Sequence, residues 1–118
     1  MDLNEIKELL QAYFDTGYAA DGTGMAKVFH DGSHLYGRGD DGELIFWDKD
    51  TFVNIIENKE PEYARNDEII SIDFTGENTA VARVKVRVGD KIYTDILSLM
   101  KLDGKWGIIA KVFTSVPA

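Results

Sequence analysis

The stretch 79-TAVARVKVRVGDKIYTDILSL-99 decides the fold, because two runs of alternating apolar residues flank the dipeptide Gly89-Asp90. Such a dipeptide between two alternating runs is typical of a two-residue β-hairpin turn. If Val88 faces Lys91 across the turn, every later pair follows, because side chains alternate between the two faces of a strand. One face is then apolar except for Asp95, and it consists of Ala80, Ala82, Val84, Val86, Tyr93, Asp95, Leu97 and Leu99.

The opposite face of this hairpin mixes cations with apolar side chains. It carries Arg83, Lys85 and Arg87 beside Ile96, Thr94 and Ile92. Cations make this face the poorer candidate for a core. We expect it to meet solvent or a second copy of the chain, and to form the outer face of the sheet.

Two further turn signals extend the hairpin into a four-stranded antiparallel meander. A two-residue turn at Asp103-Gly104 predicts that Trp106, Ile108, Ala110 and Val112 share the face of Asp95, and that Ile109, Lys111 and Phe113 lie on the other face. Before the hairpin, a three-residue loop within 75–78 would place Ile70, Ile72 and Phe74 inward and Asp67 opposite Arg87. Burial favours this register, because each large aliphatic side chain contributes about 1.5 to 3 kcal/mol.

The first half of the chain has the three- and four-residue apolar spacing of helices. This spacing predicts a helix over Leu3–Tyr18, begun by a capping box of Asp2 and Glu5. A short second helix is capped by Asp21 or Thr23 and turns Met25, Val28 and Phe29 inward, and a third begins at Asp48 and ends before Pro61. Two short strands, 33–38 and 43–47, lie between them. The predicted class is α+β, with the helices on one face of a curved sheet.

Charge and composition exclude several classes of protein. Among 118 residues, 13 lysines and arginines stand against 21 aspartates and glutamates, which gives a net charge of −8. A nucleic-acid binder needs a basic face, and an anionic membrane repels an acidic protein. The absence of cysteine removes disulfides, thiolate nucleophiles and thiolate zinc sites. We expect one domain over residues 1–118, in the cytoplasm, with no signal peptide or membrane span at its start.

Asp95 is the first candidate site residue, because a carboxylate among Val84, Val86 and Leu97 is poorly solvated and has a raised pKa unless donors offset the burial. A structural role, in which Asp95 bonds backbone or tyrosine donors and fixes the sheet, stays open. His34 is a candidate general base, or else a half-buried strand residue beside Tyr36. We predict that the ligand pocket is lined by Tyr13, Tyr18, Phe29, Tyr36, Trp47, Phe52, Ile56, Val84, Val86, Leu97, Trp106 and Ile108.

Other motifs carry less chemistry. His30 and Asp31 are adjacent at a corner between a helix and a strand, where their side chains diverge. Two histidines without cysteine do not make a transition-metal site, so we expect no metal and no cofactor. The chain has neither a glycine-rich phosphate loop nor a nucleophile elbow, so nucleotide hydrolysis and serine hydrolase chemistry lack support.

Several short stretches, in this order and nearly end to end, resemble one protein family. They are Tyr13-Phe14-Asp15-Thr16-Gly17 with Asp21, Phe29-His30-Asp31-Gly32, His34-Leu35-Tyr36-Gly37, 94–99, Asp103-Gly104-Lys105-Trp106 and Lys111-Val112-Phe113. The chain resembles the nuclear-transport-factor-two-like superfamily and, within it, the polyketide-cyclase-like branch of putative lumazine-binding proteins. The resemblance implies a cone of three helices on a strongly bent, mostly antiparallel sheet of about six strands, enclosing a pocket. It also implies a homodimer through the outer sheet face.

The ketosteroid isomerases of that superfamily resemble this chain in part. Their tyrosine on the first helix corresponds loosely to Tyr13 or Tyr18, and their pocket acid on a late strand corresponds to Asp95. Their catalytic base lies near the end of the first strand, where this chain has Gly37. This scaffold hosts binding proteins as well as enzymes, so the fold alone does not give the function.

Three functional hypotheses follow. The first is a homodimeric domain that binds an unidentified small molecule in an enclosed, largely apolar pocket. The second is a cofactor-independent isomerase, dehydratase or cyclase, in which His34 is the base and either Asp95 or a tyrosine is the donor to a developing oxyanion. It requires His34 and Asp95 to converge within about 5 to 8 Å on one cavity. The third and weaker one is a protein-interaction module that uses the outer sheet face.

Overall fold

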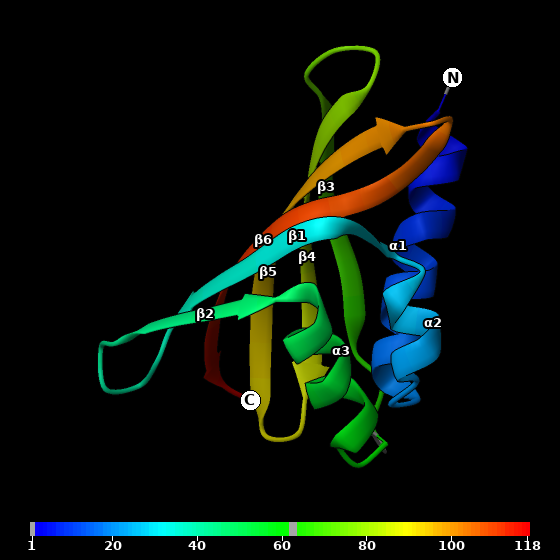
Figure 1. Ribbon diagram of the computed structural model, residues 1–118. Helices are drawn as coiled ribbons and strands as arrows, with labels where there is room; N and C mark the ends of the chain where they lie inside the picture. The colour runs from blue at the N-terminus through cyan, green and yellow to red at the C-terminus, as the bar shows by residue number, and fades with distance from the viewer. Residues whose placement is uncertain (1, 62–63) are drawn as a thin grey trace.

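The computed structural model describes residues 2–61 and 64–118 and has the predicted α+β class. Within these residues, three helices and six strands follow one another (Figure 1). Their order is α1 (Leu3–Tyr18), α2 (Gly22–Ala26), β1 (Phe29–Arg38), β2 (Leu44–Asp48), α3 (Lys49–Asn58), β3 (Asp67–Phe74), β4 (Thr79–Val88), β5 (Lys91–Leu102) and β6 (Lys105–Pro117). The helix over Leu3–Tyr18 is confirmed at both ends.

The six strands form one mixed sheet in the order β2-β1-β6-β5-β4-β3. The meander β3-β4-β5-β6 is antiparallel, as predicted, and β1 lies parallel to β6. The sheet is strongly bent, and the three helices lie on its concave side (Figure 1). Among the described residues, no helix has the length and apolar character that crossing a membrane requires.

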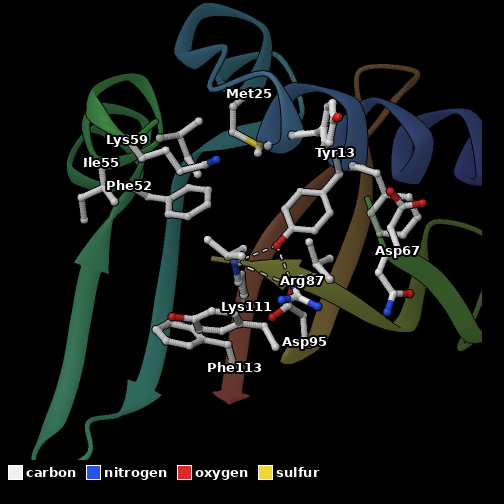
Figure 2. Close-up of a pocket in the computed structure, with 18 of the residues that line it drawn as sticks. Tyr13, Met25, Phe52, Ile55, Lys59, Asp67, Arg87, Asp95, Lys111 and Phe113 are labelled. Atoms are coloured by element: carbon white, nitrogen blue, oxygen red, sulfur yellow. Dashed lines mark hydrogen bonds and ion pairs between the residues drawn. The ribbon is translucent and has the colours of Figure 1, made fainter. Parts of the chain in front are cut away.

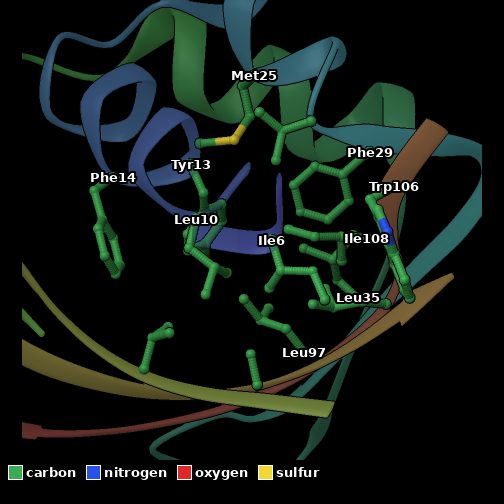
Figure 3. Close-up of a cluster of buried hydrophobic side chains, with 14 of the residues drawn as sticks. Ile6, Leu10, Tyr13, Phe14, Met25, Phe29, Leu35, Leu97, Trp106 and Ile108 are labelled. Atoms are coloured by element: carbon green, nitrogen blue, oxygen red, sulfur yellow. The ribbon is translucent and has the colours of Figure 1, made fainter. Parts of the chain in front are cut away.

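The main hydrophobic core lies between α1 and the inner sheet face. Ile6 and Leu10 of α1 point toward Leu97 of β5 and Ile108 of β6 (Figure 3). All four side chains are fully buried. Full burial of side chains of this size contributes about 1.5 to 3 kcal/mol each, which holds α1 firmly against the sheet.

The β4–β5 hairpin has the predicted register. Val88 faces Lys91 across Gly89-Asp90, and Val84 faces Asp95. Gly89 has a φ of 61°, a backbone conformation that glycine adopts without strain. Asp95 therefore lies on the inner face, and its side chain is 1% exposed.

The prediction for the end of β6 is wrong by one residue. The turn at Asp103-Gly104 is as predicted, but the register shifts after Leu99↔Ile108, so that Leu97 faces Lys111 and Asp95 faces Phe113. The extra residue is a β-bulge, which bends the strand and exchanges the two faces beyond it. Lys111 and Phe113 consequently point inward, whereas Ala110 and Val112 point outward.

In β3, a second register shift makes part of the prediction wrong. Ile72 and Phe74 lie opposite Ala82 and Ala80, on the inner face as predicted. The register then shifts between Ile69 and Ser71, so Ile70 is 41% exposed and Asp67 faces Val86 instead of Arg87. Phe74 pairs with Ala80, and the Thr75 N–H donates to the carbonyl oxygen of Thr79 at 3.0 Å, so the predicted three-residue loop is confirmed.

Two of the three predicted helix caps are present. Asp21 accepts a hydrogen bond from the backbone N–H of Gly24, and Asp48 accepts one from Thr51. Asp2 makes no side-chain cap, so the predicted capping box is wrong. Its carboxylate instead accepts hydrogen bonds from Trp106 Nε1 at 2.9 Å and Lys101 Nζ at 3.2 Å. These bonds tie the start of α1 to the β5–β6 hairpin, and they lower the pKa of Asp2.

Candidate functional site

A cavity of about 140 Å³ lies between the helices and the inner sheet face (Figure 2). Its wall is mainly apolar and aromatic, and comes from α1, α2 and α3, from β2 to β6, and from residues 64–66 before β3. It is lined by Tyr13, Phe14, Gly17, Tyr18, Met25, Trp47, Phe52, Ile55, Ile56, Lys59, Ala64, Arg65, Asn66, Asp67, Val86, Arg87, Val88, Tyr93, Asp95, Lys111 and Phe113.

Three buried polar side chains meet in this cavity, and we call them the Tyr13–Asp95–Lys111 cluster. The Tyr13 hydroxyl donates to Asp95 Oδ2 at 2.7 Å, and Lys111 Nζ donates to the Tyr13 hydroxyl oxygen at 2.7 Å. Lys111 Nζ lies 3.8 Å from Asp95 Oδ2. The side chains come from α1, β5 and β6 and point toward one another (Figure 2). The fold thus builds one polar centre inside an apolar cavity.

Aromatic rings surround the Lys111 amine. Its Nζ lies 4.6 Å from the centroid of Phe52, 5.3 Å from that of Tyr13 and 5.4 Å from that of Phe113. Phe113 has room because Gly37 on β1 has no side chain; a Cβ there would lie 2.4 Å from the Phe113 ring. The position where the resemblance expects an isomerase base is thus filled by an aromatic ring.

Burial changes the acidity of two groups in the cluster. It lowers the pKa of Lys111 below the ordinary 10.5, although the nearby Asp95 carboxylate acts in the opposite direction. Burial also raises the pKa of Tyr13 well above 10.0, and the charge of Asp95 and its hydrogen bond add to that shift. Tyr13 therefore keeps its proton at neutral pH, while Lys111 is more easily deprotonated than a surface lysine.

One oxygen of Asp95 has no partner. Within residues 2–61 and 64–118, no hydrogen-bond donor reaches Asp95 Oδ1, although this atom is fully buried. An unpaired buried polar atom costs about 1 to 3 kcal/mol, so such atoms are uncommon in folded proteins. A donor on a bound molecule would remove this cost.

Cations are concentrated around the cavity despite the acidic composition of the chain. Among the described residues, Lys59, Arg65 and Arg87 line it together with Lys111, and the carboxylates that line it are Asp67 and Asp95. The Arg65 guanidinium also bonds Asp67 at 2.7 Å, and it lies 5.0 Å from the centroid of Tyr18. The local field favours an electron-rich or anionic group near these cations.

Seven of the residues predicted for the site line this cavity. They are Tyr13, Tyr18, Trp47, Phe52, Ile56, Val86 and Asp95. Five predicted pocket residues belong to the packed core instead: Phe29, Val84, Leu97, Trp106 and Ile108. These five have the inward orientation that the pattern gives, but they are at most 4% exposed, because α1 and neighbouring core side chains cover them (Figure 3).

Tyr36 and His34 lie on the outer sheet face, so the structure does not bring His34 and Asp95 together. On β1, Leu35 is fully buried on the inner face. Because side chains alternate along a strand, its neighbours His34 and Tyr36 point outward. His34 stacks on Phe46 at 5.3 Å and lines a separate shallow depression with Asp31, Gly32, Ser33, Asp48, Lys49 and Asp50. His34 and Asp95 therefore do not converge on one cavity, which a joint catalytic role requires.

Lys111 is the member of the cluster that sequence reasoning missed. Strict alternation from Asp103-Gly104 places it outside, and only the bulge at Ile109 turns it inward. The available signal was a lone lysine between apolar residues on a strand of a strongly curved sheet, where bulges are common. His30 has a structural role, since its Nε2 lies 2.7 Å from the carbonyl oxygen of Met100. No cluster of metal-ligating side chains occurs in the described ranges.

Comparisons with known proteins give the family of this chain and support the described fold. The family model described as "Putative lumazine-binding" matches residues 1–114. The solved NTF2-like protein of unknown function from Shewanella baltica is 27% identical, with a TM-score of 0.92 over 99% of this chain and 95% of that one. The corresponding protein from Methylobacillus flagellatus is 29% identical, with a TM-score of 0.89 over 98% and 92%.

A curated relative matches only in part. Aldolase FrzH from a Cladobotryum species is 42% identical over 41 residues, which is 33% of either chain. The family match, by contrast, covers nearly the whole sequence, and the NTF2-like structures superpose on nearly the whole fold. The chain therefore belongs to the putative lumazine-binding family of the NTF2-like superfamily.

Proposed function

We propose that this chain is a small-molecule-binding domain whose ligand places a hydrogen-bonding group against the Tyr13–Asp95–Lys111 cluster. The carrying observation is the unpaired Asp95 Oδ1 inside an otherwise apolar cavity. Pockets of this composition bind ligands by burying an apolar body and orienting it with a few polar contacts. Asp95 accepts from the ligand, and Lys111 donates to it.

The dimensions favour a planar ligand. A cavity of roughly 150 Å³ lined by apolar side chains holds one benzene ring, so the volume of about 140 Å³ accommodates one ring. A second ring or a charged substituent extends toward Lys59 and Arg87. Lumazine, the compound in the family description, is a flat fused-ring dione with N–H donors for Asp95 and carbonyl oxygens for Lys111.

Tyr13→Phe is expected to weaken binding by about 10- to 100-fold. It removes the hydroxyl that links Asp95 and Lys111 but keeps the ring. A hydrogen bond to a charged group contributes about 1.5 to 3 kcal/mol, and each 1.4 kcal/mol is a factor of ten. The measurement is isothermal titration calorimetry with lumazine and with 4-hydroxybenzoate.

Tyr36→Phe is the matched control, because it makes the same change on the outer sheet face. It should leave the dissociation constants unchanged. Equal effects of the two substitutions, or no saturable binding of either compound to the wild type, would count against the proposal.

An enzymatic role for His34 and Asp95 is not favoured, since the two side chains lie on opposite sheet faces. Any chemistry in the cavity would depend on the cluster itself. The cluster holds a hydroxyl that carries its proton at neutral pH, a carboxyl group, and an amine within hydrogen-bonding reach of the hydroxyl.

We also propose that a second copy of the chain covers the outer sheet face. A row of neighbouring apolar side chains crosses four strands there: Phe46, Tyr36, Val112 and Ile96. They are 37% to 53% exposed. A contiguous exposed apolar patch commonly marks an interface, and a homodimer buries the same patch from both copies.

Val112→Glu is expected to convert this dimer to a monomer, because it places two carboxylates in the centre of the patch. Sedimentation velocity at micromolar concentration measures the change. Thr51→Glu, on the exposed side of α3, should leave the dimer intact. A monomeric wild type under the same conditions would contradict the assignment of this face.

A further inference from the structure

We propose that the Lys111 amine is a nucleophile that forms an imine with an aldehyde or ketone held in the cavity. This inference rests on the proposed function and adds a substrate class to it, namely carbonyl compounds with an apolar or aromatic body. It starts from position: Lys111 is 7% exposed, lines the cavity, and lies next to both a hydroxyl and a carboxyl group.

The amine is suited to this chemistry because its surroundings disfavour its charge. Only the neutral amine has the lone pair that attacks a carbonyl carbon, and a lysine becomes a nucleophile when an apolar pocket desolvates it. Burial acts in that direction on Lys111 and lowers its pKa. In the part of the chain that the structure describes, the other charged groups that line this cavity are Lys59, Arg65, Asp67, Arg87 and Asp95, and of these Asp95 opposes the decrease in the pKa of Lys111.

The neighbouring groups supply the proton transfers. As Lys111 Nζ bonds to the carbonyl carbon, the carbonyl π electrons move to oxygen, which takes a proton from the Tyr13 hydroxyl 2.7 Å from the amine. Asp95, hydrogen-bonded to Tyr13, passes protons between the ammonium nitrogen and the tyrosine oxygen. The carbinolamine hydroxyl then takes a proton from the Tyr13 hydroxyl and leaves as water, while the nitrogen lone pair forms the C=N bond. The remaining nitrogen proton returns through Asp95 to the tyrosine oxygen. One amine and one carbonyl give one imine and one water, with no change of oxidation state.

The aromatic rings around the amine favour a flat carbonyl compound. The ring centroids of Phe52 and Phe113 lie 4.6 Å and 5.4 Å from Lys111 Nζ, and both rings line the cavity. A planar imine conjugated with an aromatic ring has ring faces to pack against on that wall. Benzaldehyde fits the one-ring volume and serves as the probe.

Reductive trapping tests the inference directly. The wild-type protein is incubated at pH 7 with benzaldehyde and sodium cyanoborohydride, which converts an imine to a stable benzyl amine. Intact mass spectrometry counts the benzyl groups, and peptide mapping locates them. The expected result is one benzyl group that forms on Lys111 at least tenfold faster than on any other lysine.

Two variants serve as comparisons. Lys111→Met should lose the fast-forming benzyl group and keep the slow labelling of the other lysines, whereas Lys105→Met, on the exposed β5–β6 turn, should react like the wild type. Should Lys111→Met fail to fold, as judged by circular dichroism, peptide mapping of the wild type decides alone. Equal rates at all lysines would overturn the inference.

Benzyl alcohol separates this inference from the proposed function, because it has nearly the same shape and forms no imine. One outcome is that benzyl alcohol perturbs the methyl resonances of Ile55 and Ile56 in an NMR titration while benzaldehyde does not label Lys111 preferentially. That outcome would contradict imine formation but would still support a binding site in the cavity. If neither compound acts at the cavity, both proposals fail.

Discussion

Asp95→Ala is expected to lower the free energy of unfolding by about 3 kcal/mol or more. The substitution leaves the Tyr13 hydroxyl and the Lys111 amine in an apolar environment without their shared acceptor. It also enlarges the cavity, because Asp95 is 1% exposed to solvent and its side chain lines the cavity wall. Urea denaturation followed by circular dichroism measures the loss.

Comparison variants separate the polar contribution from a general loss of packing. Asp95→Asn keeps an acceptor for Tyr13 and most of the volume, so it should cost about 1 kcal/mol. Asp73→Ala, at an exposed position of β3, should change stability by no more than about 0.5 kcal/mol. A cost for Asp95→Ala as small as that of Asp73→Ala would show that the cluster is not a buried hydrogen-bonded unit.

Lys111→Met is expected to change how stability depends on pH. The pKa of Lys111 is lowered in the folded protein, while the unfolded chain has the ordinary value of 10.5. Between these two values the unfolded chain binds more protons than the folded one, so the wild type gains stability as the pH rises toward 10.5. Methionine does not titrate. The stability of the wild type relative to Lys111→Met should therefore rise with pH, by at most about 1.4 kcal/mol per pH unit.

Denaturation curves of both proteins between pH 7 and the neighbourhood of pH 10 make this comparison. Ionisation of Tyr13 affects stability only above this pH range, because its pKa is raised above 10.0, and both proteins keep Tyr13. Lys105→Met, at an exposed lysine, should show a constant difference from the wild type. A relative stability that falls as the pH rises would mean that Asp95 outweighs burial and raises the pKa of Lys111.

Alternation and turn chemistry are local properties, and for this reason they predicted much of the fold. Gly89-Asp90 determines the β4–β5 register, and that register places Asp95 inside. The spacing over Leu3–Tyr18 likewise determines the face of α1 that carries Tyr13. Two members of the cluster were accordingly among the predicted site residues.

The positions of β-bulges and the limits of the cavity depend on how the whole sheet packs. Short sequence patterns therefore do not predict them. The register shift in β6 turns Lys111 inward and Val112 outward, the reverse of the prediction. For this reason Lys111, the third member of the cluster, was not among the predicted site residues. Inward orientation also does not separate pocket from core. Leu97 and Val86 both point inward, but only Val86 lies where the helices leave the sheet uncovered.

The most direct test of the central claim, that this cavity is a ligand site, is an NMR titration of the protein labelled at its isoleucine and methionine methyl groups. Lumazine and 4-hydroxybenzoate should shift the resonances of Met25, Ile55 and Ile56, which line the cavity, in a saturable manner. Ile96, on the outer sheet face, should not move. Saturable shifts confined to Ile96, or no shift at the three cavity residues with either compound, would contradict the claim.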